Sequence, residues 1–291
     1  MKVNPVYRQE TKVSARSFRF PMVILLFNGV LALVALLNMY SVVTQVKRTA
    51  EIQYSSFINL YVFVAIVEFM LLLFLVPAIT AGSISGERER KTLDLMLTTE
   101  ITAADIVLGK LFACLSTVLL LIVSSFPIIS LSFVYGGVML KDIALLFICY
   151  SVTGLLIGSI SIFCSACFKK STIATAAGYL LTAVVIGGTV AVNHLVYSLM
   201  AITSPQGAGG SGGWFYLLLI NPASIFRAAL SSQMGSELRL AGVLPWMAQM
   251  PDTIITRYWM IFGVLVQTAL SFVFLRLAAW RVEPSRKGKR R

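Results

Sequence analysis

The sequence predicts an all-α polytopic membrane protein with six transmembrane helices. Composition is the first reason, because 58% of the 291 residues are hydrophobic and only 12% are charged, whereas soluble domains usually hold about 25% charged residues. The second reason is six apolar runs long enough to cross a hydrocarbon core about 30 Å thick, which takes roughly 20 helical residues. These runs cover approximately residues 21–43, 57–81, 106–134, 143–167, 172–197 and 258–280.

We expect the whole chain, 1–291, to form a single transmembrane domain. Its longest predicted external segment, about residues 198–257, lies between the fifth and sixth spans and contains the flexible stretch SPQGAGGSGG. The apolar stretch WFYLLLI that follows is too short to span a bilayer. Its predicted form is therefore a re-entrant or interfacial segment, and both a cap on the translocation path and a loose surface lid stay open.

Lysine and arginine predict the orientation of the chain, because they accumulate on the cytoplasmic side of short loops. They cluster in residues 2–19, 88–110 and 281–291, whereas the loops on the opposite side hold few. Both termini are therefore expected in the cytoplasm, with the protein in the cell membrane. The formal charge of +12 reflects this topology and attraction to anionic lipid heads, and we expect no nucleic-acid partner because no soluble domain remains.

The segment before the first span is expected to be an amphipathic helix lying in the plane of the membrane interface, at about residues 8–20. Its basic side chains, Arg8, Lys12, Arg16 and Arg19, would face lipid phosphate groups and anchor the helix.

No residue pattern indicates an enzyme. Cys164 and Cys167 form a C-x-x-C, but no second pair or nearby histidine completes a zinc set. The stretch GSISG resembles a serine-hydrolase elbow but has Ile84 where the serine must stand. A Walker A sequence is missing, so any ATP hydrolysis is expected in a separate subunit, and we expect no cofactor in this chain.

One acidic residue falls in the middle of a span. Glu68 stands within VAIVEFMLLL, and an ionisable group at that depth is costly and often marks a transport pathway. The alternative reading is a single interhelical hydrogen bond. In the fourth span, Gly154 and Gly158 form GLLIG, and small residues at this spacing allow close helix packing in lipid.

The charged stretch SGERERKTLDLMLTTE, between the second and third spans, is predicted to form one short amphipathic helix at about residues 85–98. Ser85 is the expected N-cap, and the acidic residues that follow suit the positive end of the helix dipole. Leu93, Met96 and Leu97 form an apolar stripe at helical spacing. Thr102 and Asp105 form a capping box that opens the third span.

The segment GERERKTLDLMLTTEITAADIVLGKLFA resembles the ABC-2 family of ATP-binding-cassette permeases, which carry E-x-E-x-G-T-L-x-x-L-L-x-T-P followed by G-K at this point. The matching positions are Glu87, Glu89, Thr92, Leu93, Leu97, Thr99, Gly109 and Lys110. Lys91 stands where glycine or a small polar residue is common, and Glu100 where proline is frequent. The stretches NPVYRQETKVSARSFRF and INPASIF are also similar to family elements before the first and last spans.

The resemblance implies a permease subunit, paired with a second permease chain, identical or paralogous. Each half would dock on an ABC-type ATPase subunit that binds ATP and Mg²⁺. The 85–98 helix would be the coupling helix, and ATPase closure would drive alternating access and export of an amphiphile, drug, peptide, lipid or glycan. The residues implied in coupling are Glu87, Arg88, Glu89, Arg90, Thr92, Leu93 and Leu97.

Two alternatives stay open from the sequence. A non-transporting scaffold or insertase-like protein would use the charged helix to recruit a different cytoplasmic partner. A secondary carrier would use Glu68 as its ionisable group. Dependence on an ATPase separates the permease from the scaffold.

Overall fold

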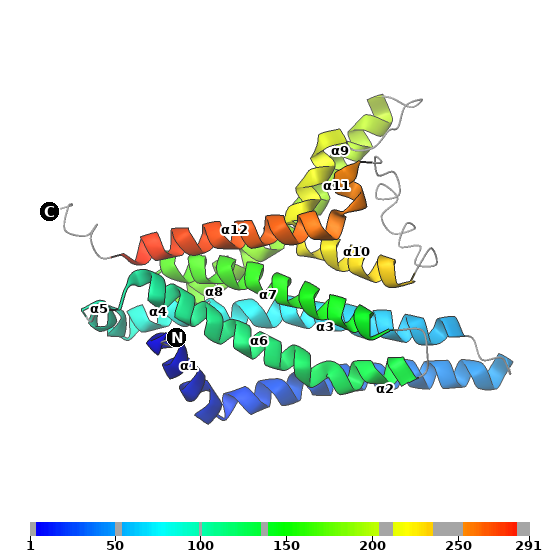
Figure 1. The fold of residues 1–291 in the computed structure, drawn as a ribbon, viewed down its shortest axis with the longest axis horizontal. Coiled ribbons are helices and arrows are strands. Elements are labelled where there is room, and N and C mark those ends of the chain that lie inside the picture. Colours follow the sequence, from blue (N-terminus) through cyan, green and yellow to red (C-terminus); the bar gives the residue numbers. More distant parts are fainter. Residues whose placement is uncertain are drawn as a thin grey trace.

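The computed structural model describes residues 4–49, 54–98, 101–134, 139–203, 212–234 and 253–283, and every regular element within them is helical (Figure 1). The elements are α1 (Pro5–Arg16), α2 (Arg19–Thr49), α3 (Tyr54–Thr80), α4 (Ser83–Glu89), α5 (Thr92–Leu97), α6 (Ala103–Val134), α7 (Leu140–Cys167), α8 (Ser171–Ala183), the π-helical turn η1 (Val184–Gly188), α9 (Thr189–Thr203), the 3-10 helix η2 (Gly212–Ile220), α10 (Pro222–Met234), α11 (Ile254–Arg257) and α12 (Trp259–Val282).

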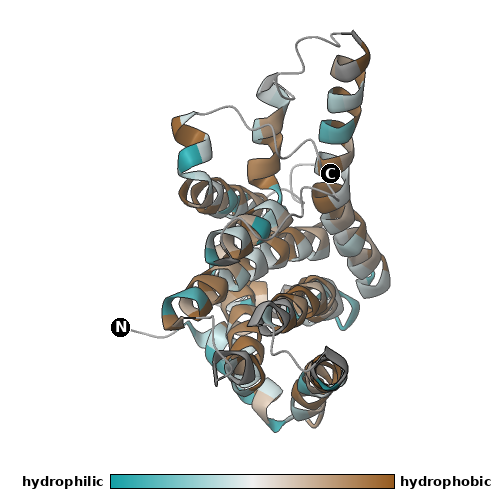
Figure 2. Ribbon diagram, turned by 90° about the vertical axis from the view of Figure 1, so that its right-hand side faces the viewer, coloured by the Kyte–Doolittle hydropathy of each residue, from teal (hydrophilic) through white to brown (hydrophobic). Residues whose placement is uncertain are grey.

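Six helical stretches in the described residues are long and apolar enough to cross a membrane, which confirms the predicted all-α, six-span fold class. They are Phe20–Thr44, Leu60–Glu89, Ala103–Ser130, Leu140–Cys167, Ser171–Met200 and Trp259–Val282. Apolar residues predominate along the helices of the bundle (Figure 2), and many large ones, such as Leu25, Phe74 and Leu265, are exposed. Exposure of this kind fits helices surrounded by lipid.

α7 lies inside the bundle and packs against α3, α6, α8 and α12. Its glycines explain the close approach of α6: a Cβ atom at Gly154 would lie 3.1 Å from Val118 Cγ1, and one at Gly158 would lie 3.4 Å from Leu111 Cδ1. Both neighbours belong to α6. The small face predicted from GLLIG therefore serves packing between α6 and α7.

The helix before the first span is shorter than expected. α1 ends at Arg16, where Ser17 adopts an extended backbone (ψ 132), and Arg19 already begins α2. The predicted helix over residues 8–20 is therefore right as far as Arg16 and wrong over residues 17–20, because the extended residue breaks the helical hydrogen-bond ladder. Arg8, Lys12 and Arg16 are exposed on α1, while Arg19 belongs to the first spanning helix.

The fifth span contains a π-helical turn, η1, between α8 and α9. Such turns widen the helix locally, and the freed backbone groups need partners. Asn221, from the INPASIF stretch, donates through its amide to the Ile186 carbonyl at 2.9 Å and to Thr189 Oγ1 at 2.8 Å. Its amide oxygen accepts from the Ala223 N–H at 2.9 Å. One buried asparagine thus caps α10 and ties it to the fifth span.

η2 and α10 meet at an angle of 93°, the form of a broken span or a re-entrant loop. The pair packs against α12: the Phe215 and Trp259 ring centroids are 4.8 Å apart, and Gln267 Nε2 donates to the Leu219 carbonyl at 3.4 Å. The predicted role of 198–257 as an external cap stays a prediction, and residues 204–211 and 235–252 lie outside the described residues.

Candidate functional site

The charged segment that follows α3 forms two short helices, α4 and α5, at the end of the bundle that also holds α1 and the end of α12 (Figure 1). The expected single helix over 85–98 is wrong. The helix is broken at Lys91, which has φ 61. A side chain in this left-handed region costs roughly 1–2 kcal/mol, and Lys91 stands where the family pattern commonly has glycine.

α4 starts inside the bundle rather than at its surface. Its N-cap is Gly82, so the prediction of Ser85 as N-cap is wrong. Ser85 is fully buried, and its N–H and that of Ile84 both donate to Ser165 Oγ of α7 at 2.9 Å. The Ser165 hydroxyl of the fourth span thereby accepts hydrogen bonds from two N–H groups in the first turn of α4, where backbone donors have no acceptor within the helix.

Two charged side chains of α4 bind the turn between α7 and α8. Arg88 donates to the Ala166 carbonyl at 3.1 Å and to the Phe168 carbonyl at 3.2 Å, which places a cation at the carboxyl end of α7. Glu89 accepts from the Ser171 N–H at 3.0 Å and from its hydroxyl at 2.7 Å, which caps the start of α8. α4 is thus bonded to both the fourth and the fifth span.

Lys110 of α6 connects α4 to α1. Its ammonium lies 2.6 Å from Glu10 Oε1 and 3.5 Å from Glu87 Oε1, and its side chain is only 3% exposed. Thr92, at the start of α5, donates to the Glu87 carboxylate. Because buried charges need paired partners, this ion cluster holds α1, α4 and α6 in one arrangement.

Gly109, next to Lys110, explains why a small residue stands beside the lysine. A Cβ atom there would lie 2.8 Å from Val6 Cβ of α1, closer than side-chain atoms normally approach. α1 is also fastened to α6 by Asn4 Nδ2, which donates to the Asp105 carbonyl at 2.8 Å. The G-K pair seen in the family pattern is therefore the docking point of α1.

The capping box predicted at the start of the third span is confirmed. The Asp105 N–H donates to Thr102 Oγ1 at 3.2 Å, and Asp105 Oδ2 accepts from the Thr102 N–H at 3.2 Å.

Glu10 is the one member of the ion cluster that sequence reasoning missed. It is the only acidic residue of α1, and that isolation among basic residues was an available signal.

The apolar coupling residues pack inward. Leu93 is 4% exposed and lies with Ile84 in a cluster formed by the ends of α6, α7 and α12, and Leu97 packs against the same cluster. Of the charged residues, Glu89, Arg90 and Lys91 are exposed, and Glu87 and Arg88 are half-buried. The residues predicted for coupling thus lie on α4, on α5 and at the break between them. Their coupling role stays a prediction.

Glu68 lies in the middle of α3, apart from this segment. It is fully buried, and one carboxylate oxygen accepts from Ser125 Oγ of α6. The other oxygen has no hydrogen-bond partner within the described residues. An interhelical hydrogen bond is therefore present, and a place on a translocation path stays a prediction.

The cysteines are free thiols, and within the described parts of the chain no group of three or more His, Cys, Asp or Glu side chains could hold a metal ion. At the α4 end the charged side chains make ion pairs and hydrogen bonds. These bonds suit a mechanical connection between a surface segment and several spans.

Comparison with known proteins gives one family. The family model described as "ABC-2 family transporter protein" matches residues 4–281, which is nearly the whole chain. No curated protein matches the chain.

Proposed function

Since the chain belongs to the ABC-2 family of transporter proteins and is a multi-pass membrane permease, we propose that it exports its substrate by alternating access, driven by a separate ATPase. That subunit would bind ATP and Mg²⁺ and hydrolyse the ATP. The α4–α5 segment, residues 83–97, would be its docking site.

The observation that carries this proposal is the set of bonds that tie the α4–α5 segment to other helices. Arg88 and Glu89 bind the α7–α8 turn, and Glu87 pairs with Lys110 of α6, which also holds α1 through Glu10. A displacement of α4 therefore acts on the third, fourth and fifth spans together.

The contact surface differs from the one the sequence alone predicts. Glu87 and Arg88 serve bonds within the chain, so the side chains left for a partner are chiefly Arg90 and Lys91, with the exposed Glu89 beside them. This surface is basic at the break between α4 and α5. A complementary partner would offer carboxylates, which steer association and set its specificity.

The remaining parts of the proposal concern orientation and assembly. We place the α4 end in the cytoplasm, since basic residues gather there. α1 would lie at the interface with Arg8, Lys12 and Arg16 on lipid phosphates. A second permease chain, identical or paralogous, would complete the translocation path.

The test is copurification from the native membrane, followed by an ATP hydrolysis assay of the complex. We compare the wild-type chain with Arg90→Glu/Lys91→Glu and with Lys141→Glu, a single charge reversal at an exposed residue at the start of α7. We expect an ATPase at equal stoichiometry with wild type and Lys141→Glu. The double variant should lose it while the purified chain keeps the melting temperature of the wild type.

A chain that is extracted alone, or with a partner that does not hydrolyse ATP, contradicts the proposal and favours a scaffold. An ATPase that stays bound to the double variant would place the docking site elsewhere. Transport that fails in Glu68→Gln despite an intact complex would assign Glu68 to the path.

A further inference from the structure

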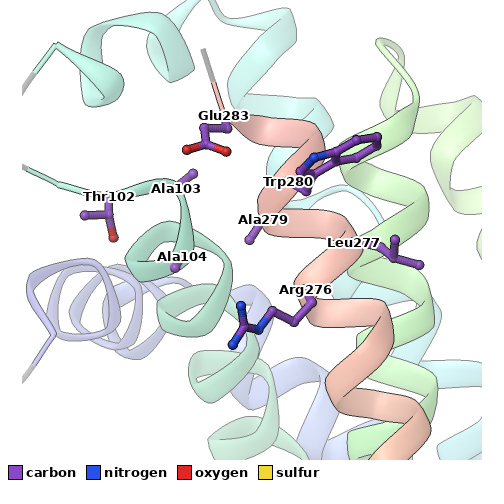
Figure 3. A pocket seen from close by; sticks show the side chains of 8 residues that line it. All are labelled: Thr102, Ala103, Ala104, Arg276, Leu277, Ala279, Trp280 and Glu283. Atoms are coloured by element: carbon purple, nitrogen blue, oxygen red, sulfur yellow. The ribbon is translucent and has the colours of Figure 1, made fainter. Parts of the chain in front are cut away.

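A cavity of about 570 Å³ lies between the first turn of α6 and the last turns of α12 (Figure 3). Its lining is mainly apolar, with one arginine and one glutamate. The lining residues are Thr102, Ala103, Ala104, Arg276, Leu277, Ala279, Trp280 and Glu283. Arg276 extends from α12 toward the first turn of α6, and Glu283 stands at the other end of the same wall.

The two charged residues lie at different depths. α12 runs from Trp259 to Val282, so Glu283 is the first residue beyond the span. Arg276 comes seven residues earlier, which is about 10 Å deeper at 1.5 Å per residue. Trp280 stands between them, and tryptophan is typical of the headgroup level. The cavity therefore opens where lipid headgroups meet the acyl chains.

No carboxylate among the described residues forms an ion pair with the Arg276 guanidinium. The guanidinium lies 5.3 Å from the Phe272 ring centroid, and the ion pairs among the described residues involve only Lys110, Glu10 and Glu87. A cation inside the membrane boundary is costly without a counter-charge. A phosphate is well suited, since the planar guanidinium binds its oxygens in a bidentate manner.

Glu283 favours one kind of phosphate over others. A carboxylate beside the same cavity repels a second negative charge but attracts an ammonium group. In a phospholipid with an ethanolamine headgroup, the phosphate lies nearer the acyl chains and the ammonium lies farther out. Arg276 and Glu283 have the same order along α12, with Arg276 deeper and Glu283 at the outer end.

We propose that this cavity binds one phospholipid whose headgroup carries a free ammonium, of the phosphatidylethanolamine class. Arg276 holds the phosphate, and Glu283 accepts hydrogen bonds from the ammonium. The acyl chains run along the exposed apolar face of α12 that includes Phe272, Val273 and Leu277. The lipid would fill the space between α6 and α12 and so join the two helices.

The test measures lipid binding to the purified full-length chain in mixed micelles by native mass spectrometry. The probes are dioleoyl-phosphatidylethanolamine and dioleoyl-phosphatidylglycerol at equal concentrations. The variants are Arg276→Gln and Glu283→Gln, with Arg281→Gln as the matched control, because Arg281 is an exposed arginine of α12 outside the cavity lining. Melting temperatures without added lipid verify that each variant is folded.

We expect the wild type and Arg281→Gln to retain the ethanolamine lipid in preference to the glycerol lipid. Arg276→Gln should bind both lipids at least about tenfold more weakly, the size of a lost charge-assisted hydrogen bond. Glu283→Gln should lose the preference while still binding a phospholipid. Equal binding of the two lipids by the wild type, unchanged binding by Arg276→Gln, or equal weakening by Arg281→Gln would overturn the proposal.

Discussion

Replacing Lys110 with methionine should weaken the attachment of α1 to the bundle. Methionine keeps most of the buried aliphatic volume and removes the ammonium that lies 2.6 Å from Glu10 and 3.5 Å from Glu87. Two carboxylates then face each other without a cation. α1 retains its contacts through Asn4 and Val6, so we expect it to open more often rather than to be lost.

The magnitude follows from the geometry of the cluster. Breaking a fully buried ion pair costs roughly 3–5 kcal/mol, but Glu10 and Glu87 keep 34% and 20% side-chain exposure and can be solvated after the change. A charge-assisted hydrogen bond alone is worth about 1.5–3 kcal/mol. We therefore expect Lys110→Met to lower the free energy of opening α1 by about 2–3 kcal/mol, which raises the open population roughly 30- to 150-fold.

Hydrogen exchange measures this opening directly, because protected amides exchange in proportion to the open population. The amides of α1 (Pro5–Arg16) should exchange faster by that factor in Lys110→Met, while those of α7 stay near their wild-type rates. Lys141→Met is the control, since it makes the same substitution at an exposed lysine. A double-mutant cycle with Glu10→Gln should show coupling of at least about 1 kcal/mol.

Unchanged exchange of α1 in Lys110→Met would refute this account of the ion cluster. Equal acceleration in Lys141→Met would show that the effect does not come from the pair. Additive effects of Lys110→Met and Glu10→Gln would mean that the two groups do not interact energetically.

Substitutions at two further sites, Lys91 and Asn221, test local features. Lys91→Gly should raise the melting temperature, because it relieves the left-handed backbone at φ 61 for a net gain of about 0.5–1 kcal/mol in unfolding free energy. Arg90→Gly, the control at a right-handed position, should lower the melting temperature. A decrease in both variants would contradict the strain at Lys91. Asn221→Ala should lower the unfolding free energy by about 2–3 kcal/mol. Asn221→Asp should recover only the part due to the α10 cap, because aspartate keeps the accepting oxygen but not the donor to η1. Equal loss in the two variants, measured by thermal unfolding in micelles, would contradict separate contributions of Asn221 to the α10 cap and to η1.

The fold class was predictable because crossing a bilayer constrains composition so strongly. Six apolar runs in the sequence correspond to six helices that can span a membrane. The capping box at Thr102 was also predictable, since both of its partners lie within one turn. The start of α4 failed because a distant group decides it, since Ser165 of α7 supplies the acceptor. The breaks at Ser17 and Lys91 failed because the backbone there leaves the right-handed helical region.

The candidate site was predictable only as a stretch of sequence. The family pattern pointed to Glu87, Glu89 and the Gly109-Lys110 pair, but not to their partners. Glu10 is 100 residues from Lys110 along the chain, and Ser171 is 82 residues from Glu89. No local pattern reports such contacts, so the residues expected to face an ATPase could not be separated from those that bind within the chain.

The sequence by itself determined that this chain spans a membrane, that it has six spanning helices and that it carries one charged segment of family-specific pattern, because hydropathy and motif spacing are local properties. Tertiary structure alone decided that Lys110 holds α1 to α4, that Asn221 joins α10 to the π-helical turn, and that Arg276 and Glu283 share one cavity. The physical reason is that these arrangements depend on how helices far apart in the sequence approach one another, and in lipid that approach is set by side-chain packing and buried polar contacts rather than by hydropathy.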